Sequence, residues 1–209
     1  MRKTITIVLA SLLTLAFSNA YAQIENGQWS AGGGFTTMSL AGADKGKVFD
    51  EIIPGYFFGA SLDYAFSTID GLTVEPGVYI VHYGKTFATY LATHENSHKG
   101  NYIHVPLNIK YAFLTEPDLR VSAFTGPRIN IGLGGSLFDN SANYAGLKLF
   151  DSQWGIGASV LFKEAISLSA GYDFGISRCA RDKTVDKAKI RDNAQVRRNS
   201  FYFGVGFAF

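Results

Sequence analysis

The 209-residue sequence predicts an all-β protein, an eight-stranded antiparallel up-and-down transmembrane β-barrel with long extracellular loops and short periplasmic turns. Three observations predict this fold class. Large apolar residues recur with a period of two in eight segments, long and short connections alternate between those segments, and the last segment ends on an aromatic face. Because successive side chains of a strand point to opposite faces, each segment has one face suited to an apolar phase.

The last segment, residues 200–209, has the clearest pattern. One face carries Phe201, Phe203, Val205, Phe207 and Phe209. The other face carries Tyr202, Gly204, Gly206 and Ala208. A strand whose outer face meets lipid has good reason to look this way, and most outer-membrane barrels stop on an aromatic residue. We therefore expect Phe201, Phe203, Phe207 and Phe209 to form an assembly signal, with the barrel-assembly machinery as a partner.

The other seven segments follow the same period, each near the ~9–11 residues that cross a bilayer at a tilt. They are 29–40, 56–66, 72–82, 102–113, 119–131, 152–162 and 166–177. The connections 41–55, 83–101, 132–151 and 178–199 are long, and 67–71, 114–118 and 163–165 are short. A soluble lipocalin-like barrel or sandwich would turn the apolar face inward. Three features favour the membrane barrel instead: the last segment ends on an aromatic face, long and short connections alternate, and the second face of the strands is polar and rich in glycine.

The N-terminus has the features of a secretory signal peptide. Arg2 and Lys3 precede an apolar run, and the sequence Ala20-Tyr21-Ala22 fits a cleavage site. We expect residues 1–22 to be removed and residues 23–209 to form the barrel domain. A retained anchor is the alternative, but the run is short for a spanning helix. Arg2 and Lys3 are two of the 19 basic residues, so 17 basic and 17 acidic residues remain, which gives no argument for a nucleic-acid partner.

Several motifs resemble a known family. The strand sequence of residues 102–113 (YIHVPLNIKYAF), the triplets Glu75-Pro76-Gly77 and Thr125-Gly126-Pro127, and the aromatic end are similar to the small outer-membrane β-barrel domain family, which includes PorT-type and OmpX-like barrels. The resemblance covers essentially the whole mature chain. It implies a location in the Gram-negative outer membrane, and it implies no catalytic site, because the family shares none.

The small-residue face of the strands also carries charged residues. They are Asp63, Glu75, Lys110, Arg120, Arg128 and Asp173. An eight-stranded barrel is just wide enough for side chains to fill its interior, and unpaired buried charges are costly. We interpret the six residues as a lumen charge network that plugs the barrel, with Glu75, Lys110 and Arg120 in one cluster. A selective pore or a proton path is the alternative.

Two features resemble catalytic motifs. The sequence from His94 to His98 (HENSH) matches the H-E-x-x-H pattern of zinc proteases, which requires a helix and a third ligand. Here it lies in a long connection, has polar x positions and is followed by a strand. His82 lies at the rim of a strand, but the sequence places no serine and carboxylate beside it. We therefore expect no catalytic residue, no metal and no cofactor.

The connection 178–199 is strongly basic. Its cations are Arg178, Arg181, Lys183, Lys187, Lys189, Arg191, Arg197 and Arg198. Against three aspartates, these eight give a balance of +5. Facing outward, the loop would meet the phosphates of lipopolysaccharide, although a solvated, mobile loop is an equal alternative. The single cysteine, Cys179, rules out an internal disulfide, and we expect it to be an incidental thiol exposed in this loop.

These observations predict a non-enzymatic outer-membrane barrel with a filled lumen that presents four extracellular loops for structural, adhesion or interaction roles. Outer-membrane lipid and lipopolysaccharide are the expected partners, and any extracellular partner is unknown. A narrow passive channel and an enzyme that modifies lipid A are the alternatives, because fold alone does not supply function.

Overall fold

A closed eight-stranded antiparallel barrel forms the body of the protein, which confirms the predicted fold class. The computed structural model describes residues 27–42, 52–66, 68–84, 99–138, 146–180, 183–185, 188–190 and 196–209. The barrel strands are β1 (Gly27–Ala41), β2 (Ile53–Ala65), β3 (Leu72–Tyr83), β4 (Gly100–Glu116), β5 (Leu119–Gly134), β6 (Phe150–Phe162), β7 (Ile166–Gly175) and β10 (Arg197–Ala208). Among the described residues, no helix is long and apolar enough to cross a membrane.

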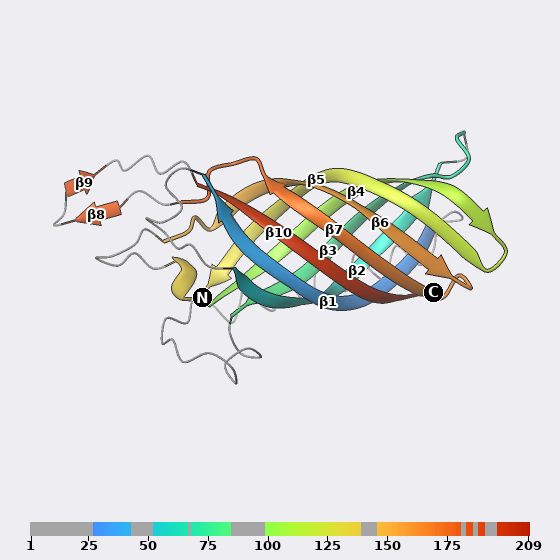
Figure 1. Cartoon of the computed structure of the whole chain (residues 1–209), viewed down its shortest axis with the longest axis horizontal. Coiled ribbons are helices and arrows are strands. Elements are labelled where there is room, and N and C mark those ends of the chain that lie inside the picture. Colours follow the sequence, from blue (N-terminus) through green and yellow to red (C-terminus); the bar gives the residue numbers. More distant parts are fainter. Residues whose placement is uncertain are drawn as a thin grey trace, which may run out of the picture.

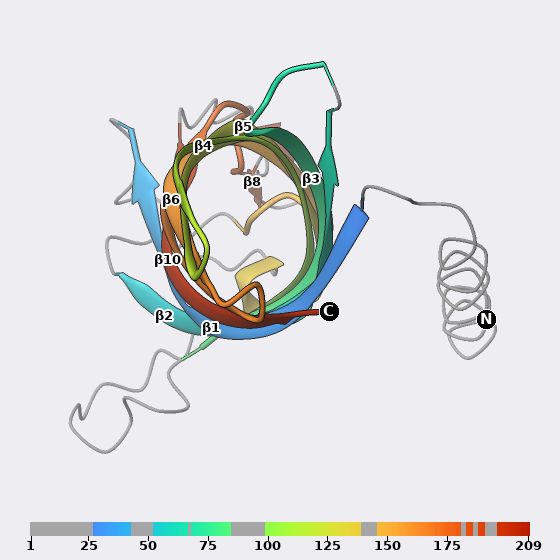
Figure 2. The ribbon, with the colours of Figure 1, turned by 90° about the vertical axis from the view of Figure 1, so that its right-hand side faces the viewer.

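Each strand pairs with its neighbour in the chain, and the barrel closes where β1 pairs with β10 (Figures 1 and 2). In that closing pair Ser30 lies opposite Ala208, and Ala41 lies opposite Arg197. The backbone of Phe209 continues the pairing, since its N–H donates to the Trp29 carbonyl at 2.8 Å and its carbonyl accepts from the Trp29 N–H at 3.2 Å. Closure leaves no unpaired sheet edge, which an apolar phase would penalise.

The two ends of the barrel differ. Short connections join β2 to β3, β4 to β5 and β6 to β7 at one end, here called the turn end, where Figure 1 also shows the C-terminus. In the β6–β7 connection Lys163 and Glu164 both have positive φ (50° and 53°), as in the tight hairpin turns that match strand twist. A small hairpin of β8 (Lys183–Val185) and β9 (Ala188–Ile190) extends beyond the opposite end, the loop end.

The outward face of the barrel is apolar and the inward face is polar. The exposed large apolar side chains include Phe58, Ile80, Ile109, Ile156 and Phe203, one from each of five strands. The buried polar side chains include Ser61, Asn108, Arg128, Gln153 and Asp173. This inverts the pattern of a soluble barrel, so the chain has the surface of a barrel that is solvated by lipid.

Several strands extend beyond their predicted limits at the loop end. β10 begins at Arg197 rather than at residue 200, and β6 begins at Phe150 rather than at residue 152. These extra residues continue the alternation of faces, so Arg198 and Asp151 point into the barrel, where both side chains are buried.

Candidate functional site: the barrel interior

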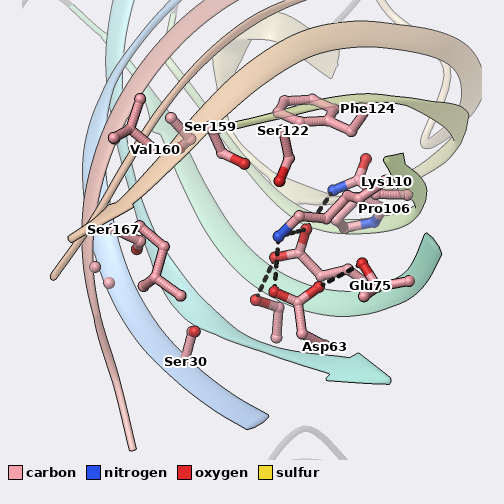
Figure 3. Close-up of a pocket in the computed structure, with 18 of the residues that line it drawn as sticks. Ser30, Asp63, Glu75, Pro106, Lys110, Ser122, Phe124, Ser159, Val160 and Ser167 are labelled. Carbon is pink, nitrogen blue, oxygen red and sulfur yellow. Dashed lines mark hydrogen bonds and ion pairs between the residues drawn. The ribbon is translucent and has the colours of Figure 1, made fainter. Parts of the chain in front are cut away.

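A charged cluster occupies the inner wall toward the turn end. Lys110 of β4 lies between two carboxylates, with its Nζ 2.7 Å from Oδ2 of Asp63 on β2 and 3.3 Å from Oε2 of Glu75 on β3 (Figure 3). The strand register brings the three residues to one level, because Glu75 pairs with Asn108 and Thr73 pairs with Lys110. We call Asp63, Glu75 and Lys110 the turn-end cluster.

Neutral polar groups orient the carboxylates of this cluster. The Ser61 hydroxyl donates to Glu75 Oε1 at 2.7 Å, and Asn108 Nδ2 donates to Glu75 Oε2 at 3.0 Å. Thr73 Oγ1 donates to Asp63 Oδ1 at 3.3 Å. Asn108 Oδ1 is buried and has no hydrogen-bond partner among the described residues. Hydrogen bonds from neighbouring strand residues therefore hold the two carboxylates in place, and Asn108 Oδ1 remains as an acceptor without a partner in the described part of the chain.

Arg120 lies outside the turn-end cluster, and the expectation that it joins Glu75 and Lys110 was wrong. Lys110 pairs across β4 and β5 with Phe124, so Arg120 lies four residues further toward the turn end, about 13 Å along the strand. Its guanidinium Nη2 is 3.9 Å from Oε1 of Glu164 in the β6–β7 turn, and the two side chains are 36% and 73% exposed. Arg120 thus belongs to the mouth of the barrel.

The interior of the loop end contains a second ion pair, deeply buried. Arg128 Nε lies 3.2 Å from Oδ1 of Asp173, and both side chains are almost fully buried. Arg128 also donates to the Gly126 carbonyl at 3.2 Å and is 3.5 Å from the Tyr202 hydroxyl. Gly155 on the adjoining wall leaves the space that this pair fills, since a Cβ there would overlap the guanidinium. Here a glycine on β6 accommodates a large side chain from the neighbouring strand β5.

A third ion pair lies beside it and joins Arg198 of β10 to Asp151 of β6. Arg198 Nη2 is 3.0 Å from Asp151 Oδ1, with side-chain exposures of 1% and 3%. The guanidinium carbon also lies 4.3 Å from the centre of the Tyr102 ring, a cation–π geometry. Asn130 and Gln153 complete the network, because Asn130 Nδ2 donates to Asp151 Oδ1 at 2.9 Å and to Gln153 Oε1 at 2.8 Å.

This placement corrects two expectations. Arg198 was expected to contact lipopolysaccharide from a loop, but it is a buried strand residue because β10 starts earlier than predicted. The lumen network was expected to contain six charges, yet it also contains Asp151 and Arg198. Extending the alternation of Ser200 and Tyr202 back by one step would have placed Arg198 inside, and the same step back from Gln153 would have placed Asp151 there.

An apolar cap covers this network at the loop end. It contains Leu137 and Phe138 of the 3₁₀ helix Ser136–Phe138, together with Leu147, Cys179 and Val196, all of them buried. An isolated bridge joins Leu147 to Ala180, and the Lys148 N–H donates to the Cys179 carbonyl at 2.7 Å. The loop bases thus cover the loop end of the barrel, and the arginine side chains beneath them are almost fully buried. We call the Arg128–Asp173 and Arg198–Asp151 pairs with this cap the loop-end plug.

Cys179 is therefore not the exposed thiol that the sequence suggested. Its side chain is fully buried, and Sγ lies 3.4 Å from the Val196 carbonyl. Burial, followed by the nearby Asp151 carboxylate, raises the pKa of this thiol from its ordinary value of 9.0 to about 12. A protonated, covered thiol is chemically inert at neutral pH.

Between the plug and the turn end lies a cavity of about 370 Å³. The turn-end cluster lines one side of it, and hydroxyl groups of Ser30, Ser159 and Ser167 line the opposite side (Figure 3). Asp70 and Arg120 line it at the turn end, and Arg128, Asp173, Tyr83 and Ser200 line its deep end. The cavity is thus a cup that reaches the turn end and stops short of Arg198 and Asp151, neither of which lines it.

The remaining sequence motifs lie at the loop end or outside the described residues. His82 faces outward, stacks against Tyr56 with ring centres 5.1 Å apart, and places Nδ1 2.6 Å from Asn101 Oδ1. The His94–His98 motif lies outside the described residues, as do the side chains of five of the eight loop cations: Arg181, Lys183, Lys187, Lys189 and Arg191. Arg178 and Arg197 are exposed. Among the described residues, no group of three or more histidine, cysteine, aspartate or glutamate side chains could hold a metal ion.

The aromatic residues of the final strand all lie on the outer surface. Phe201, Phe203, Phe207 and Phe209 are each exposed, on the face that lipid would cover. Phe209 is also joined to Trp29 through the reciprocal backbone hydrogen bonds of the closing pair. These positions are compatible with an assembly signal, which stays a prediction.

Comparison with solved structures shows the same fold. Neisserial surface protein A is 14% identical with a TM-score of 0.50, and the match covers 88% of this chain and 100% of that one. The outer membrane enzyme PagL is 10% identical with a TM-score of 0.49, covering 86% of this chain and 97% of that one. Ail of Yersinia pestis, solved with the heparin analogue sucrose octasulfate, is 13% identical with a TM-score of 0.43, covering 88% and 99%.

At 14% identity the likeness to Neisserial surface protein A shows the fold and no activity. Comparison with curated proteins gives no match. A model of the family described as outer membrane protein beta-barrel domain matches residues 21–180, which is more than half of the chain. With an apolar exterior, eight closed strands and this match, the chain belongs to the outer membrane protein beta-barrel domain family.

Proposed function

We propose that this protein is a non-enzymatic, non-conducting barrel whose plugged end supports extracellular loops that contact lipopolysaccharide. The observation that carries the proposal is the loop-end plug. Two ion pairs and an apolar cap fill the loop half of the lumen, and the loop bases themselves form the cap. A barrel built in this way holds its loop bases rigidly, which suits presentation of a surface.

A narrow channel would need a continuous polar path, and the cup does not reach the Arg198–Asp151 pair, since neither residue lines it. We expect the purified protein to give no stable conductance steps in planar lipid bilayers, with a large general porin as the positive control. Reproducible steps of uniform size from the wild-type protein would refute the proposed closed lumen.

An enzyme that hydrolyses or transfers acyl chains would need an activated nucleophile at the rim. The Nδ1 partner of His82 is the amide of Asn101, and no serine hydroxyl is hydrogen-bonded to this histidine in the described part of the chain. We expect lipid A isolated from cells with and without the protein to have the same mass spectrum. A consistent mass difference that disappears with His82→Ala would establish the enzyme instead.

The cationic rim supports the lipopolysaccharide contact. Arg178 and Arg197 are exposed near the loop end, and Lys148 lies beside Arg178 in a shallow groove with Leu149 and Phe150. Cations next to apolar side chains suit a phosphorylated lipid at the membrane surface.

We expect lipopolysaccharide binding to weaken when Arg178 and Arg197 are both changed to Ser, and to weaken with added salt, because exposed charges are screened over about 10 Å at 0.1 M. The control is Lys163→Ser, which removes an exposed cation from the opposite end of the barrel. Equal binding by the double variant and the control would remove the support for this contact.

A further inference from the structure

The charges inside the described barrel do not balance. Three cations, Lys110, Arg128 and Arg198, face four carboxylates. Arg128 and Arg198 each have one carboxylate partner, whereas Lys110 has two, so the excess negative charge lies in the turn-end cluster. His104 is counted here as neutral, and Arg120 at the mouth has its own partner in Glu164.

A buried carboxylate without a counter-charge is costly, especially within a membrane. The excess charge faces the cup rather than the plug, because Asp63, Glu75 and Lys110 all line the cavity. The opposite side of the cavity carries serine hydroxyls from three strands, at Ser30, Ser159 and Ser167 (Figure 3), and Ser169 also lines the cavity. Asn108 also lines the cavity, and its buried Oδ1 lacks a partner among the described residues.

We infer that the cup is a binding site, open to the periplasm, for a small organic ammonium compound that carries hydroxyl groups. The ammonium group supplies the missing positive charge beside Asp63 and Glu75. The hydroxyl groups exchange hydrogen bonds with the serine wall and with Asn108. A volume of about 370 Å³ suits a molecule of monosaccharide size or slightly larger, and it far exceeds the space that a bare metal ion occupies.

Aromatic side chains add a second element of recognition. Tyr79, Phe57 and Phe124 line the same cavity and give its lining an apolar part. Sites for small molecules commonly combine apolar surface with a few placed polar groups. This inference depends on the geometry of the cup and not on the proposed role of the loops.

The test is calorimetric titration of the folded barrel in detergent with three probes of equal size and different charge: glucosamine, glucose and glucuronate. We expect saturable binding of glucosamine with a Kd on the order of 1 mM, the scale for a ligand of this size. Glucose should bind at least about tenfold more weakly, since it lacks the charge-assisted contact. Glucuronate should not bind.

Two variants connect the binding to the cup. Asp63→Asn removes the excess charge and should weaken glucosamine binding by about tenfold or more. The matched control is Glu116→Gln, which removes one negative charge from an exposed residue at the turn end that does not line the cavity, and it should leave the affinity unchanged within about twofold. Heat-modifiable gel migration reports whether each variant is folded.

Ser167→Leu keeps every charge and fills the cup, so it tests the site even where Asp63→Asn does not fold. Loss of glucosamine binding in this variant supports the site. Absence of saturable glucosamine binding to the wild-type protein, equal binding of glucose and glucosamine, or unchanged affinity in folded Asp63→Asn or Ser167→Leu would each overturn the inference. No result of this experiment depends on conductance or on lipopolysaccharide.

Discussion

Replacing Asp151 by Asn should destabilise the barrel through the charge it leaves behind. Asp151 Oδ1 is the acceptor for Arg198 Nη2 at 3.0 Å and for Asn130 Nδ2 at 2.9 Å. The amide keeps an acceptor oxygen but removes the negative charge. Arg198 then stays cationic, fully buried and unable to reach solvent past the cap. Its Nε and Nη1 already lack partners in the described part of the chain.

Breaking a buried ion pair by removing one partner typically costs about 3–5 kcal/mol. The lower end applies here, because the Tyr102 ring 4.3 Å away keeps part of the cation's stabilisation. A loss of about 3 kcal/mol changes the unfolding equilibrium constant by a factor of about 150. Changing Arg198 to Met together with Asp151→Asn removes both charges, so the double variant should be more stable than Asp151→Asn alone.

The assay is reversible urea unfolding in lipid vesicles, followed by gel migration and by fluorescence. The control is Glu164→Gln at the mouth, where the pair with Arg120 is exposed and 3.9 Å long, and it should cost less than about 1 kcal/mol. The inference that Asp151 stabilises the buried Arg198 would be refuted by either of two results. One is a loss of unfolding free energy for Asp151→Asn that is no larger than the loss for the control. The other is strict additivity of the losses in the single and double variants.

Three further predictions follow from the same geometry. Lys110→Gln should destabilise more than Glu75→Gln, because Glu75→Gln leaves Lys110 paired with Asp63 at 2.7 Å whereas Lys110→Gln leaves two carboxylates together; equal losses of unfolding free energy would contradict this. Cys179 should resist a thiol reagent in the folded protein and react after unfolding. Burial raises the pKa of its thiol to about 12, so the contribution of the protonated thiol to the free energy of unfolding is complete below about pH 9 and is lost as the pH rises toward about 12. Unfolding experiments at a series of pH values measure this loss. Deleting Phe209 should lower the folded population in the outer membrane, since it removes the reciprocal pairing with Trp29 at barrel closure; normal heat-modifiability in the deletion would count against it.

The alternation of side chains predicts which face a strand residue occupies, and it succeeds in the middle of strands. Asp63, Glu75 and Lys110 were expected inside and lie inside. The physical reason is strong: a slip by one residue would move every polar side chain of the strand into lipid. Face is therefore the most predictable property of this chain.

The ends of strands are harder, because polar residues there are tolerated on either face. The basic run around Arg197 and Arg198 has the composition of a loop, so β10 was expected to begin after it. Arg197 is exposed and Arg198 is buried, as the alternating faces of a strand require. Cys179 was misplaced for a related reason, since the sequence does not show that the loop bases fold back over the mouth.

The alternation of faces predicts neither how far along the barrel a residue lies nor which residue it contacts. Arg120 occupies the predicted face, yet it lies about 13 Å from the level of Lys110, because the register between β4 and β5 sets the depth. Register in a barrel follows from strand tilt and stagger around the whole ring, and no single strand determines it. The pairing of Arg198 with Asp151 joins residues 47 apart and depends on the same closure.

The two halves of the lumen call for different physical reasoning. In the plug every cation has one carboxylate partner, the arginine side chains are almost fully buried, and removal of any charge leaves its partner buried in a medium of low dielectric constant. In the cup one carboxylate is in excess, hydroxyl groups line the facing wall, and the space continues to the turn end. Variants of the plug should therefore change stability and the surface presented by the loops, and variants that fill the cup should change solute binding with little effect on the loops. The Arg128–Asp173 and Arg198–Asp151 pairs separate these two effects, because they lie between the cup and the cap that the loop bases form.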